Sequence, residues 1–557
     1  MPTPLRRAAT AAGAALLAVV LSATAGCTAT SSTAGTAADT SAEPVDGGNA
    51  TYAINVEPSC LDPHVSPADA TAVIQRGVFD SLVEEDAKGI PHPWLARSWK
   101  IGDGGRTYDF TLRDDVSFHD GTHLDAAAVK ANFDHITAPA TKSQYAASLF
   151  GPDYKGTTVT GRYTLRVSFG SPFSPFLQGV STTYLGIESP KALAAGQSAL
   201  CAAGTHSVGT GPFKETSRTV GRQLVLSRNP AYRWGPQDGG PTGPAHLSTL
   251  TIRFLTDDTT RVGTLTSGQI DAAVLPVTAA ASVRANPQLQ LLSHQAPGEV
   301  YSFQLNTVRG PLEDQRVRLA LLHSLDIGGL VKAVYLGVYQ RAWSPLSPST
   351  PNSYDAALEN TWTYDPKQAG SLLDQAGWTG RDAQGYRTKD GRRLTLVWPT
   401  VAAASVRDER GALADGFQAQ AKAVGIQLKQ VVTDEGTYYK DAYTSDYDIL
   451  DVSWARGDGD ILRGFYLGGA NPEHGGQNAA RTDDPQVNSW LLAAASTTDP
   501  AQRRADYAKV QQWVIDHAVT VPVYVGSYLV GASKSLHGIT FDVSGWPLFA
   551  RAWTTRR

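Results

Sequence analysis

The residues best suited to hold a ligand lie in one short loop of the C-terminal half. Trp454 closes a predicted strand, and the carboxylates Asp458 and Asp460 follow shortly after it. In open α/β sheets ligands bind beyond the carboxyl ends of the strands. An aromatic surface beside carboxylates suits a solute with an apolar body and a cationic or hydroxylated end. We therefore predict that Trp454 stacks on a solute and that Asp458 and Asp460 pair with its cation or hydroxyl. The alternative is a core tryptophan followed by a solvated acidic turn.

Patterns that signal catalysis or metal binding are missing from the sequence. It contains no G-x-S-x-G, H-E-x-x-H or G-x-x-x-x-G-K-[ST] segment. His119 and His123 would share one face of a helix, but the turn dipeptide Asp120-Gly121 lies between them. The three cysteines have no metal-type spacing. We predict no catalytic residue, no metal site and no cofactor.

The N-terminal segment has the organisation of an export signal. Arg6 and Arg7 precede an uncharged run over residues 8–25, whose strongly apolar part is far shorter than the ~20 residues of a membrane span. Residues 24–27, Thr-Ala-Gly-Cys, resemble the lipobox of bacterial lipoproteins, in which the cysteine takes a diacylglycerol. We predict a signal peptide over residues 1–26, lipidation of Cys27, and a flexible tether over residues 27–49. The alternative is a chance cysteine beside an ordinary secretory cleavage site.

The two other cysteines are Cys60 and Cys201. Export places them in an oxidising compartment, where a pair of cysteines can cross-link. We predict a disulfide between them, and the alternative is two separate buried thiols.

The composition is that of an ordinary globular protein. Hydrophobic residues make up 42% of the 557 positions and charged residues 18%, which excludes a mostly disordered chain. The formal net charge is −4, from 48 basic and 52 acidic residues, so the basic footprint of a nucleic-acid-binding protein is not expected. The length predicts about two to four domains.

Periodic hydrophobic residues predict the elements that must position the loop. Alternation predicts strands over residues 106–113, 165–169, 224–226, 252–254 and 521–525. Helices are predicted after Asp125, Asp314, Asp365 and Asp499, each of which can cap a first turn. The last two are followed by proline, which suits the first helical position.

Residues 392–454 alternate between element types. Strands are predicted at 394–398, 426–432 and 447–454, with a helix over 408–424. This order is a β-α-β unit, which implies parallel pairing of its strands through a right-handed crossover. Residues 50–260 are richer in alternating strands, so the sequence predicts two α/β lobes of different build.

Several long segments resemble the family 5 extracellular solute-binding proteins, which are the peptide, opine and nickel binding components of ABC importers. The resemblance begins at residues 55–64 (Asn-Val-Glu-Pro-Ser-Cys-Leu-Asp-Pro-His) and 78–83, and continues at 93–99 and 108–121. Further matching segments are 208–214 (Val-Gly-Thr-Gly-Pro-Phe-Lys), 229–232, 306–318 and 364–366. In the family's order, the resemblance covers about residues 50–550.

The resemblance implies an α/β, two-lobed periplasmic-binding-protein-like fold of type II, in the large peptide-binding subclass, with a hinge. Lobe I would comprise residues 50–302 and 522–557, and lobe II residues 303–521. Two crossing strands near 301–306 and 521–525 would form the hinge, beside which we expect Gln304 and Asn306 as polar contacts and Trp343 as a pocket wall. A solute that touches both lobes favours the closed form.

The resemblance also implies a function. It predicts a lipid-anchored, extracytoplasmic, monomeric binding component that captures an oligopeptide-like solute and delivers it to an ABC permease without catalysis. In peptide-binding relatives, an Asp three positions after this Trp pairs with the peptide ammonium, but here Gly457 holds that position and Asp458 follows. The alternatives are a nickel chelate, with His474 as a candidate contact, an opine, a secreted hydrolase, or a surface signalling or chaperone-like module.

Overall fold

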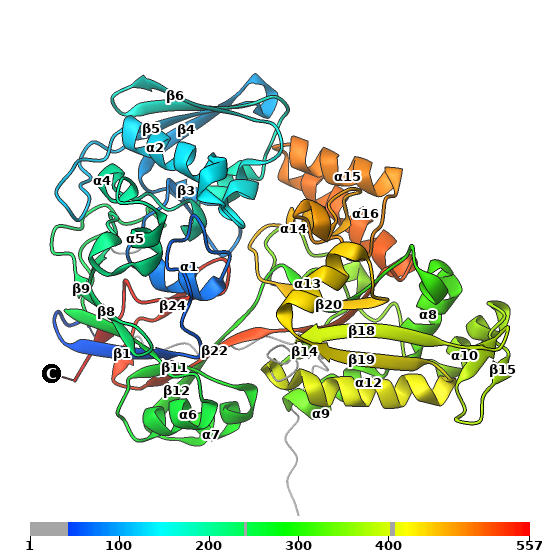
Figure 1. Cartoon of the computed structure of the whole chain (residues 1–557). Coiled ribbons are helices and arrows are strands. Elements are labelled where there is room, and N and C mark those ends of the chain that lie inside the picture. The colour runs from blue at the N-terminus through cyan, green and yellow to red at the C-terminus, as the bar shows by residue number, and fades with distance from the viewer. Residues whose placement is uncertain (1–42, 239–241, 402–406, 557) are drawn as a thin grey trace, which may run out of the picture. The chain divides into compact units, whose positions relative to one another are not determined.

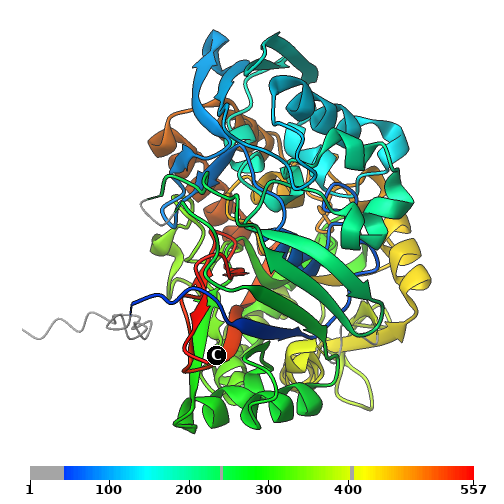
Figure 2. The ribbon, with the colours of Figure 1, turned by 90° about the vertical axis from the view of Figure 1, so that its left-hand side faces the viewer.

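A mixed sheet of seven strands is the largest sheet in the described part of the chain (Figure 1). The computed structural model describes residues 43–238, 242–401 and 407–556. In Figure 2 the blue strand β1 lies beside the green strand β10, to which it is parallel. In spatial order the strands are β12 (Leu289–Gln295), β22 (Ser527–Ser533), β11 (Ala272–Val274), β1 (Asn49–Ile54), β10 (Thr249–Phe254), β9 (Gln223–Arg228) and β8 (Phe213–Thr219).

A second sheet is built on two fully buried strands. Its order is β14 (Gln340–Arg341), β21 (Thr520–Val525), β13 (Glu299–Leu305) and β20 (Ile449–Trp454). Every residue of β13 and β21 is buried, so β21 does not have the half-buried alternation that the sequence predicts. The chain passes from β12 into β13 and from β21 into β22, and between these strands Ala296 N donates to Gly526 O at 2.9 Å. Two neighbouring segments therefore connect the two sheets.

The predicted β-α-β unit is confirmed. Strands β18 (Thr395–Val401) and β19 (Gln427–Thr433) pair in parallel, and α12 (Arg410–Val424) connects them and lies along the pair in Figure 1. Strand β20 follows in sequence and pairs antiparallel with β13. The loop after Trp454 consequently starts at the carboxyl end of a strand that is integrated into a sheet.

The strands predicted at 224–226 and 252–254 are β9 and β10 of the seven-stranded sheet, whereas those predicted at 106–113 and 165–169 belong to a separate antiparallel sheet. Its order is β4 (Ala96–Gly102), β5 (Thr107–Leu112), β7 (Thr164–Phe169) and β6 (Tyr154–Gly161). Helix α2 (Ala126–Thr137) packs on this sheet, and its Phe133 lies in one hydrophobic cluster with Phe110 of β5 and Val167 of β7. Asp125 caps α2 as predicted, because its carboxylate accepts from Ala128 N at 2.8 Å.

The other predicted caps also begin helices in the structure. Asp314, Asp365 and Asp499 each accept a backbone N–H of the first turn. Besides α2 and α12, the α-helices in the described residues are α1 (Asp69–Gln75), α3 (Phe176–Gly179), α4 (Pro190–Leu193), α5 (Gln197–Ala202), α6 (Asp258–Thr266), α7 (Ala280–Ala285), α8 (Gln315–Ser324), α9 (Ile327–Tyr335), α10 (Pro366–Gln375), α13 (Glu435–Thr444), α14 (Ile461–Tyr466), α15 (Pro485–Ser496) and α16 (Pro500–Asp516). Short strands pair as β2 (Val83–Glu85) with β3 (Pro91–Pro93), β23 (Leu536–His537) with β26 (Trp553–Thr554), β24 (Thr540–Phe541) with β25 (Pro547–Leu548), and β16 (Arg387–Lys389) with β15 (Gly380–Arg381) and β17 (Arg392–Arg393).

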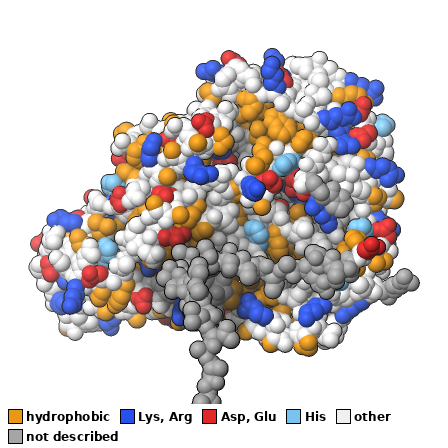
Figure 3. Space-filling view, turned by 180° about the vertical axis from the view of Figure 1, so that it is seen from behind, with side chains coloured by type: hydrophobic (Ala, Val, Ile, Leu, Met, Phe, Trp, Pro, Cys, Tyr) orange, Lys and Arg blue, Asp and Glu red, His pale blue; other side chains and the backbone are white. Residues whose placement is uncertain are grey.

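The surface and the N-terminal segment are relevant to the predicted extracytoplasmic location of the protein. On the face shown in Figure 3, basic and acidic side chains are interspersed and not gathered by sign. Among the described residues, none of the helices has the length and apolar character that crossing a bilayer requires. The predicted signal peptide, Cys27 and residues 27–42 of the predicted tether lie outside the described residues.

Candidate functional site

Trp454 ends β20, and the loop after it carries a buried arginine. Arg456 is 3% exposed. Its guanidinium carbon lies 4.7 Å from the ring centroid of Trp454, 4.1 Å from that of Tyr145 and 5.1 Å from that of Tyr184. The negative faces of aromatic rings attract a cation. Trp454 and two rings from a distant part of the sequence therefore form an aromatic cage around one guanidinium.

One side of the caged guanidinium is anchored by a carboxylate. Arg456 Nη1 donates to Asp69 Oδ1 at 3.0 Å, and Asp69 is the first residue of α1. The Asp69 carboxylate also accepts from the hydroxyls of Tyr184 at 3.3 Å and Tyr528 at 3.2 Å. Trp546 Nε1 in turn donates to the Tyr528 hydroxyl at 2.9 Å. This network fixes the orientation of Arg456.

The opposite edge of the guanidinium has no partner among the described residues. Arg456 Nε and Nη2 are buried and make no hydrogen bond. In an arginine these two nitrogens form a fork that can grip both oxygens of a carboxylate. Arg113 uses this edge on Asp115, with N–O distances of 2.9 and 2.7 Å. Because an unpaired buried donor is costly, the free edge of Arg456 is suited to an anionic ligand.

The electrostatics keep this arginine charged. Burial disfavours the cation, but the oxygens of Tyr145, Tyr184 and Asp69 outweigh that effect and raise the pKa of Arg456 above its ordinary value. The cage can therefore offer a permanent positive charge in a place from which most water is excluded. Charge-assisted hydrogen bonds are stronger there than at an exposed surface.

The structure pairs both predicted acids with arginines nearby. Asp458 forms an ion pair with Arg503 at 2.9 Å, and Asp460 forms one with Arg463 at 2.7 Å. Their carboxyl groups are only 12% and 11% exposed. Each negative charge thus already has a partner within the chain, and the pairing of these acids with the cation or hydroxyl of a solute stays a prediction. The loop instead presents the positive charge of Arg456.

The other three predicted contacts lie in different surroundings. Trp343 packs against Trp362 and faces the guanidinium of Arg341 at 3.4 Å, in a hydrophobic cluster that does not include Trp454. Gln304 is buried in β13, where its side-chain oxygen accepts from Ala479 N at 2.8 Å. The side-chain oxygen of Gln304, which is predicted to contact the solute, is therefore already bonded to the backbone of the chain.

Asn306 follows β13 and is also fully buried. Its amide nitrogen donates to Ser445 Oγ at 2.8 Å and to Tyr447 O at 3.0 Å. Its role in this structure is to join β13 to the segment before β20. His474, the candidate contact for a nickel chelate, is exposed.

Of the six predicted contacts, Trp454 lies in the cage. Sequence reasoning missed Arg456, although it stands two positions after Trp454 in the same loop. It also missed Asp69, Tyr145 and Tyr184, which belong to segments with no recognisable spacing relative to that loop. The one available signal was a positive charge directly beyond a strand-ending tryptophan.

Cys60 and Cys201 form a disulfide bond. It joins the segment before α1 to helix α5, and Leu61 N donates to Cys201 O at 3.0 Å beside it. The bond therefore holds the segment that leads to Asp69.

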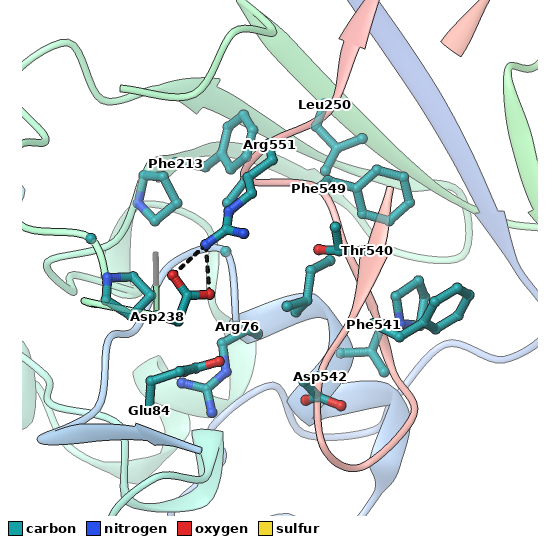
Figure 4. Close-up of a pocket in the computed structure, with 18 of the residues that line it drawn as sticks. Arg76, Glu84, Phe213, Asp238, Leu250, Thr540, Phe541, Asp542, Phe549 and Arg551 are labelled. Atoms are coloured by element: carbon teal, nitrogen blue, oxygen red, sulfur yellow. Dashed lines mark hydrogen bonds and ion pairs between the residues drawn. The ribbon is translucent and has the colours of Figure 1, made fainter. Parts of the chain in front are cut away.

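A cavity of about 240 Å³ lies apart from the cage (Figure 4). Phe213, Leu250 and Phe549 form part of its apolar wall. Arg551 and Asp238 face each other in it, with N–O distances of 2.6 and 2.7 Å. No residue of the Arg456 cage lines this cavity.

The chain matches a known protein family over most of its length. The model of the bacterial extracellular solute-binding proteins, family 5, matches residues 91–473. The nickel-binding periplasmic protein of Escherichia coli (strain K12) is 26% identical over 515 residues, which cover 88% of this chain and 91% of that protein. The glutathione-binding protein GsiB of Salmonella paratyphi A is 27% identical over 487 residues, which cover 86% of this chain and 89% of that protein.

A solved structure supports the fold. NikA from Brucella suis, in complex with Fe(III)-EDTA, superimposes with a TM-score of 0.79 at 25% sequence identity. The match covers 91% of this chain and 100% of that one. The predicted fold class, a two-lobed α/β fold of the periplasmic-binding-protein type, is confirmed by this likeness.

Proposed function

We propose that this chain, which belongs to the bacterial extracellular solute-binding proteins of family 5, holds an oligopeptide-like solute by a carboxylate in the cage around Arg456. As a family member it is extracytoplasmic and acts as the solute-binding component of an ABC importer. The observation that carries the proposal is the buried fork of Arg456, whose Nε and Nη2 lack partners among the described residues.

The cage draws on both predicted lobes. Asp69, Tyr145 and Tyr184 fall in the range predicted for lobe I, and Trp454 and Arg456 fall in that predicted for lobe II. The ion pair between Arg456 and Asp69 joins residues 387 positions apart. A solute that neutralises Arg456 and stacks on Tyr145 would add contacts to both ranges and thereby favour the closed form. We retain residues 50–302 with 522–557 and residues 303–521 as the proposed lobes.

The ligands named for the similar proteins support a carboxylate as the recognised group. Glutathione is a tripeptide with two carboxylates, and EDTA binds its iron through carboxylates. An arginine fork recognises such a group in a peptide and in a chelate alike. Because Asp458 and Asp460 are already paired, we place recognition at the anionic end of the solute and not at its ammonium.

The proposal includes attachment and mode of action. Cys27 carries the lipid that attaches the protein to the membrane, residues 27–49 act as a tether, and the monomer delivers its solute to a permease. Binding is reversible, and the solute leaves chemically unchanged. The similar proteins are named as binding proteins, which supports a non-catalytic role.

The test uses substitutions at Arg456 and matched peptides. Calorimetry with a panel of tripeptides should find binders, and C-terminal amidation of a binder should weaken binding about tenfold or more, because a charge-assisted hydrogen bond contributes about 1.5–3 kcal/mol. Arg456→Lys should have a similar effect, since lysine keeps the charge but loses the fork. Small-angle scattering should show compaction with the free-acid peptide.

The matched control is Arg97→Lys, because Arg97 is an exposed arginine that also pairs with a carboxylate. It should bind like the unmodified protein. Equal affinity for free-acid and amidated peptides would refute carboxylate recognition. If a histidine chelate of nickel binds and no peptide does, with the same loss in Arg456→Lys, the cage is retained and the peptide assignment is wrong.

A further inference from the structure

Three buried side chains near the cage form a separate cluster. Asp62, His64 and Glu188 are 1%, 0% and 1% exposed. One oxygen or nitrogen atom from each lies within 4.8 Å of the corresponding atoms of the other two. Asp62 and His64 precede α1, and Glu188 lies more than a hundred positions later in the sequence. The fold therefore collects one imidazole and two carboxyl groups in a buried place.

Each member of the cluster has a polar atom without a partner in the described chain. These atoms are Asp62 Oδ2, His64 Nδ1 and Glu188 Oε2. The other oxygen of Asp62 is engaged, because Oδ1 accepts from His64 N at 2.8 Å. Buried polar atoms in native proteins are almost always paired. Three residues of one cluster thus each have a buried polar atom without a partner, which indicates that a partner is missing.

The hydrogen bonding of His64 determines which ring nitrogen is free. Its Nε2 lies 2.8 Å from Gly186 O, and a carbonyl can only accept, so Nε2 carries the proton. Nδ1 then holds a lone pair that is directed away from this bond. A histidine that donates one ring N–H to a carbonyl and offers the other nitrogen is the arrangement found in metal sites.

Glu188 is positioned by a neighbouring amide. Asn132 of α2 accepts from Glu188 N and donates to Glu188 O, both at 2.8 Å. This two-way contact fixes the backbone from which the carboxyl group projects. His135, one turn further along α2, has its ring 5.6 Å from that of His64, and its Nε2 is likewise without a partner in the described chain.

We propose that Asp62, His64 and Glu188 bind a divalent transition-metal ion, for which Zn²⁺ is the probe. Two carboxylates and a neutral imidazole carry a total charge of −2, which a divalent cation would neutralise, so the buried complex would have no net charge. A donor set of three with one nitrogen suits Zn²⁺ better than Ca²⁺ or Mg²⁺, because those ions require more oxygen ligands or bound water.

Such a site would contradict the prediction that the chain has no metal site. It would be present whatever solute the protein binds. The ion would tie the segment that leads to Asp69 to the segment that contains Tyr184, and both residues contribute to the cage. Because a closed buried site forms only as the chain folds, the metal would enter during folding. Its role is to hold one wall of the cage and not to serve as cargo.

The first experiment counts metal in tag-free protein purified from zinc-supplemented culture. Elemental analysis should find one zinc per chain. Glu188→Gln removes one charged ligand at almost constant volume, and it should reduce zinc to less than about a tenth of an equivalent, because even outer-shell substitutions cost about 10–100-fold in affinity. Cobalt substituted into the unmodified protein should give visible absorption bands of a low-symmetry site, which requires no variant to fold.

Two control variants test whether the zinc is held by this cluster. Glu299→Gln changes a lone buried carboxyl in β13 and should retain the zinc. Arg456→Lys should also retain it, which excludes a metal chelate bound in the cage. The proposal is overturned if the unmodified protein contains neither zinc nor cobalt, or if Glu188→Gln keeps as much zinc as the unmodified chain. Zinc that is lost in Arg456→Lys alone would count against the buried cluster.

Discussion

A buried acid in β13 shows how one residue can set the pH dependence of stability. Glu299 is 3% exposed, and its Oε1 accepts from the Tyr466 hydroxyl at 3.0 Å and from Ser302 Oγ at 3.1 Å. Burial raises the pKa of Glu299 to about 8 from an ordinary value of 4.5. The folded protein therefore holds a proton that the unfolded chain releases at lower pH.

The sign of the effect follows from proton linkage. Between pH 4.5 and about 8 the folded state binds one proton more than the unfolded state at this residue, so its contribution to the free energy of unfolding falls as pH rises. Glu299→Gln cannot titrate and should remove a slope of about 1.4 kcal/mol per pH unit from denaturant-unfolding data. The exposed Glu313→Gln should leave the slope unchanged. Parallel pH profiles for Glu299→Gln and the unmodified protein would contradict this assignment.

The candidate site shows the limits of prediction for single residues. Trp454 could be predicted as a contact because its position at the end of a strand is a local feature of the sequence. Asp458 and Asp460 follow the same strand end. However, Asp458 forms an ion pair with Arg503, which is distant in the sequence, and Asp460 forms one with Arg463. Whether a carboxylate faces a ligand or an arginine depends on packing that the spacing of residues does not encode.

Helix caps were predictable because they depend on neighbouring residues. The carboxylate of Asp365 accepts from Lys367 N at 3.0 Å and Gln368 N at 2.9 Å, and Pro366 occupies the first position of α10. All the residues involved lie within a stretch of four positions, 365–368. The same local rule located the start of α2, α8 and α16.

A pair of substitutions tests the contribution of this cap. Asp365→Ala leaves two N–H groups of the first turn without a side-chain acceptor and should lower the free energy of unfolding by about 1 kcal/mol. Asp365→Asn should lower it by much less, since asparagine caps helices about as well as aspartate. Urea denaturation of the three proteins under one set of conditions measures both values. Equal losses in both variants would show that charge, and not capping, is the contribution.

Elements that pair over long distances were predicted less well. The strand at 521–525 was expected to alternate between buried and exposed positions, but β21 is covered on both faces. It lies between β14 and β13 within the four-stranded sheet. A short apolar run does not reveal how many layers cover it, because that depends on the pairing of distant segments.

The disulfide acts on the whole molecule, because it closes a loop across a large part of the chain. Cys60 and Cys201 are separated by 141 positions. A cross-link over so long a loop reduces the conformational freedom of the unfolded chain, and native disulfides typically contribute about 2–4 kcal/mol to stability. The bond also restrains the segment between Cys60 and Asp69, which carries part of both the cage and the proposed metal cluster.

Reduction should therefore lower the unfolding temperature of the unmodified protein. A variant with both Cys60→Ser and Cys201→Ser should unfold at the lower temperature with or without reductant, because it has no bond to lose. Differential scanning calorimetry under both conditions compares the two proteins. If reductant leaves the unmodified protein unaffected while a thiol assay shows that the bond has opened, the disulfide does not contribute to stability.

The sequence alone is enough to predict the features that depend on nearby residues. It identified the caps, the β-α-β unit and the segments that resemble family 5, because each is written in adjacent positions or in a regular period. Which charges remain free depends on how distant segments pack together. Arg456 keeps an open edge while Asp458 does not, and Asp62, His64 and Glu188 meet without any common spacing. The physical reason is that hydrogen bonds and ion pairs are satisfied across space, so the partner of a buried polar group is known only when distant segments have been packed together.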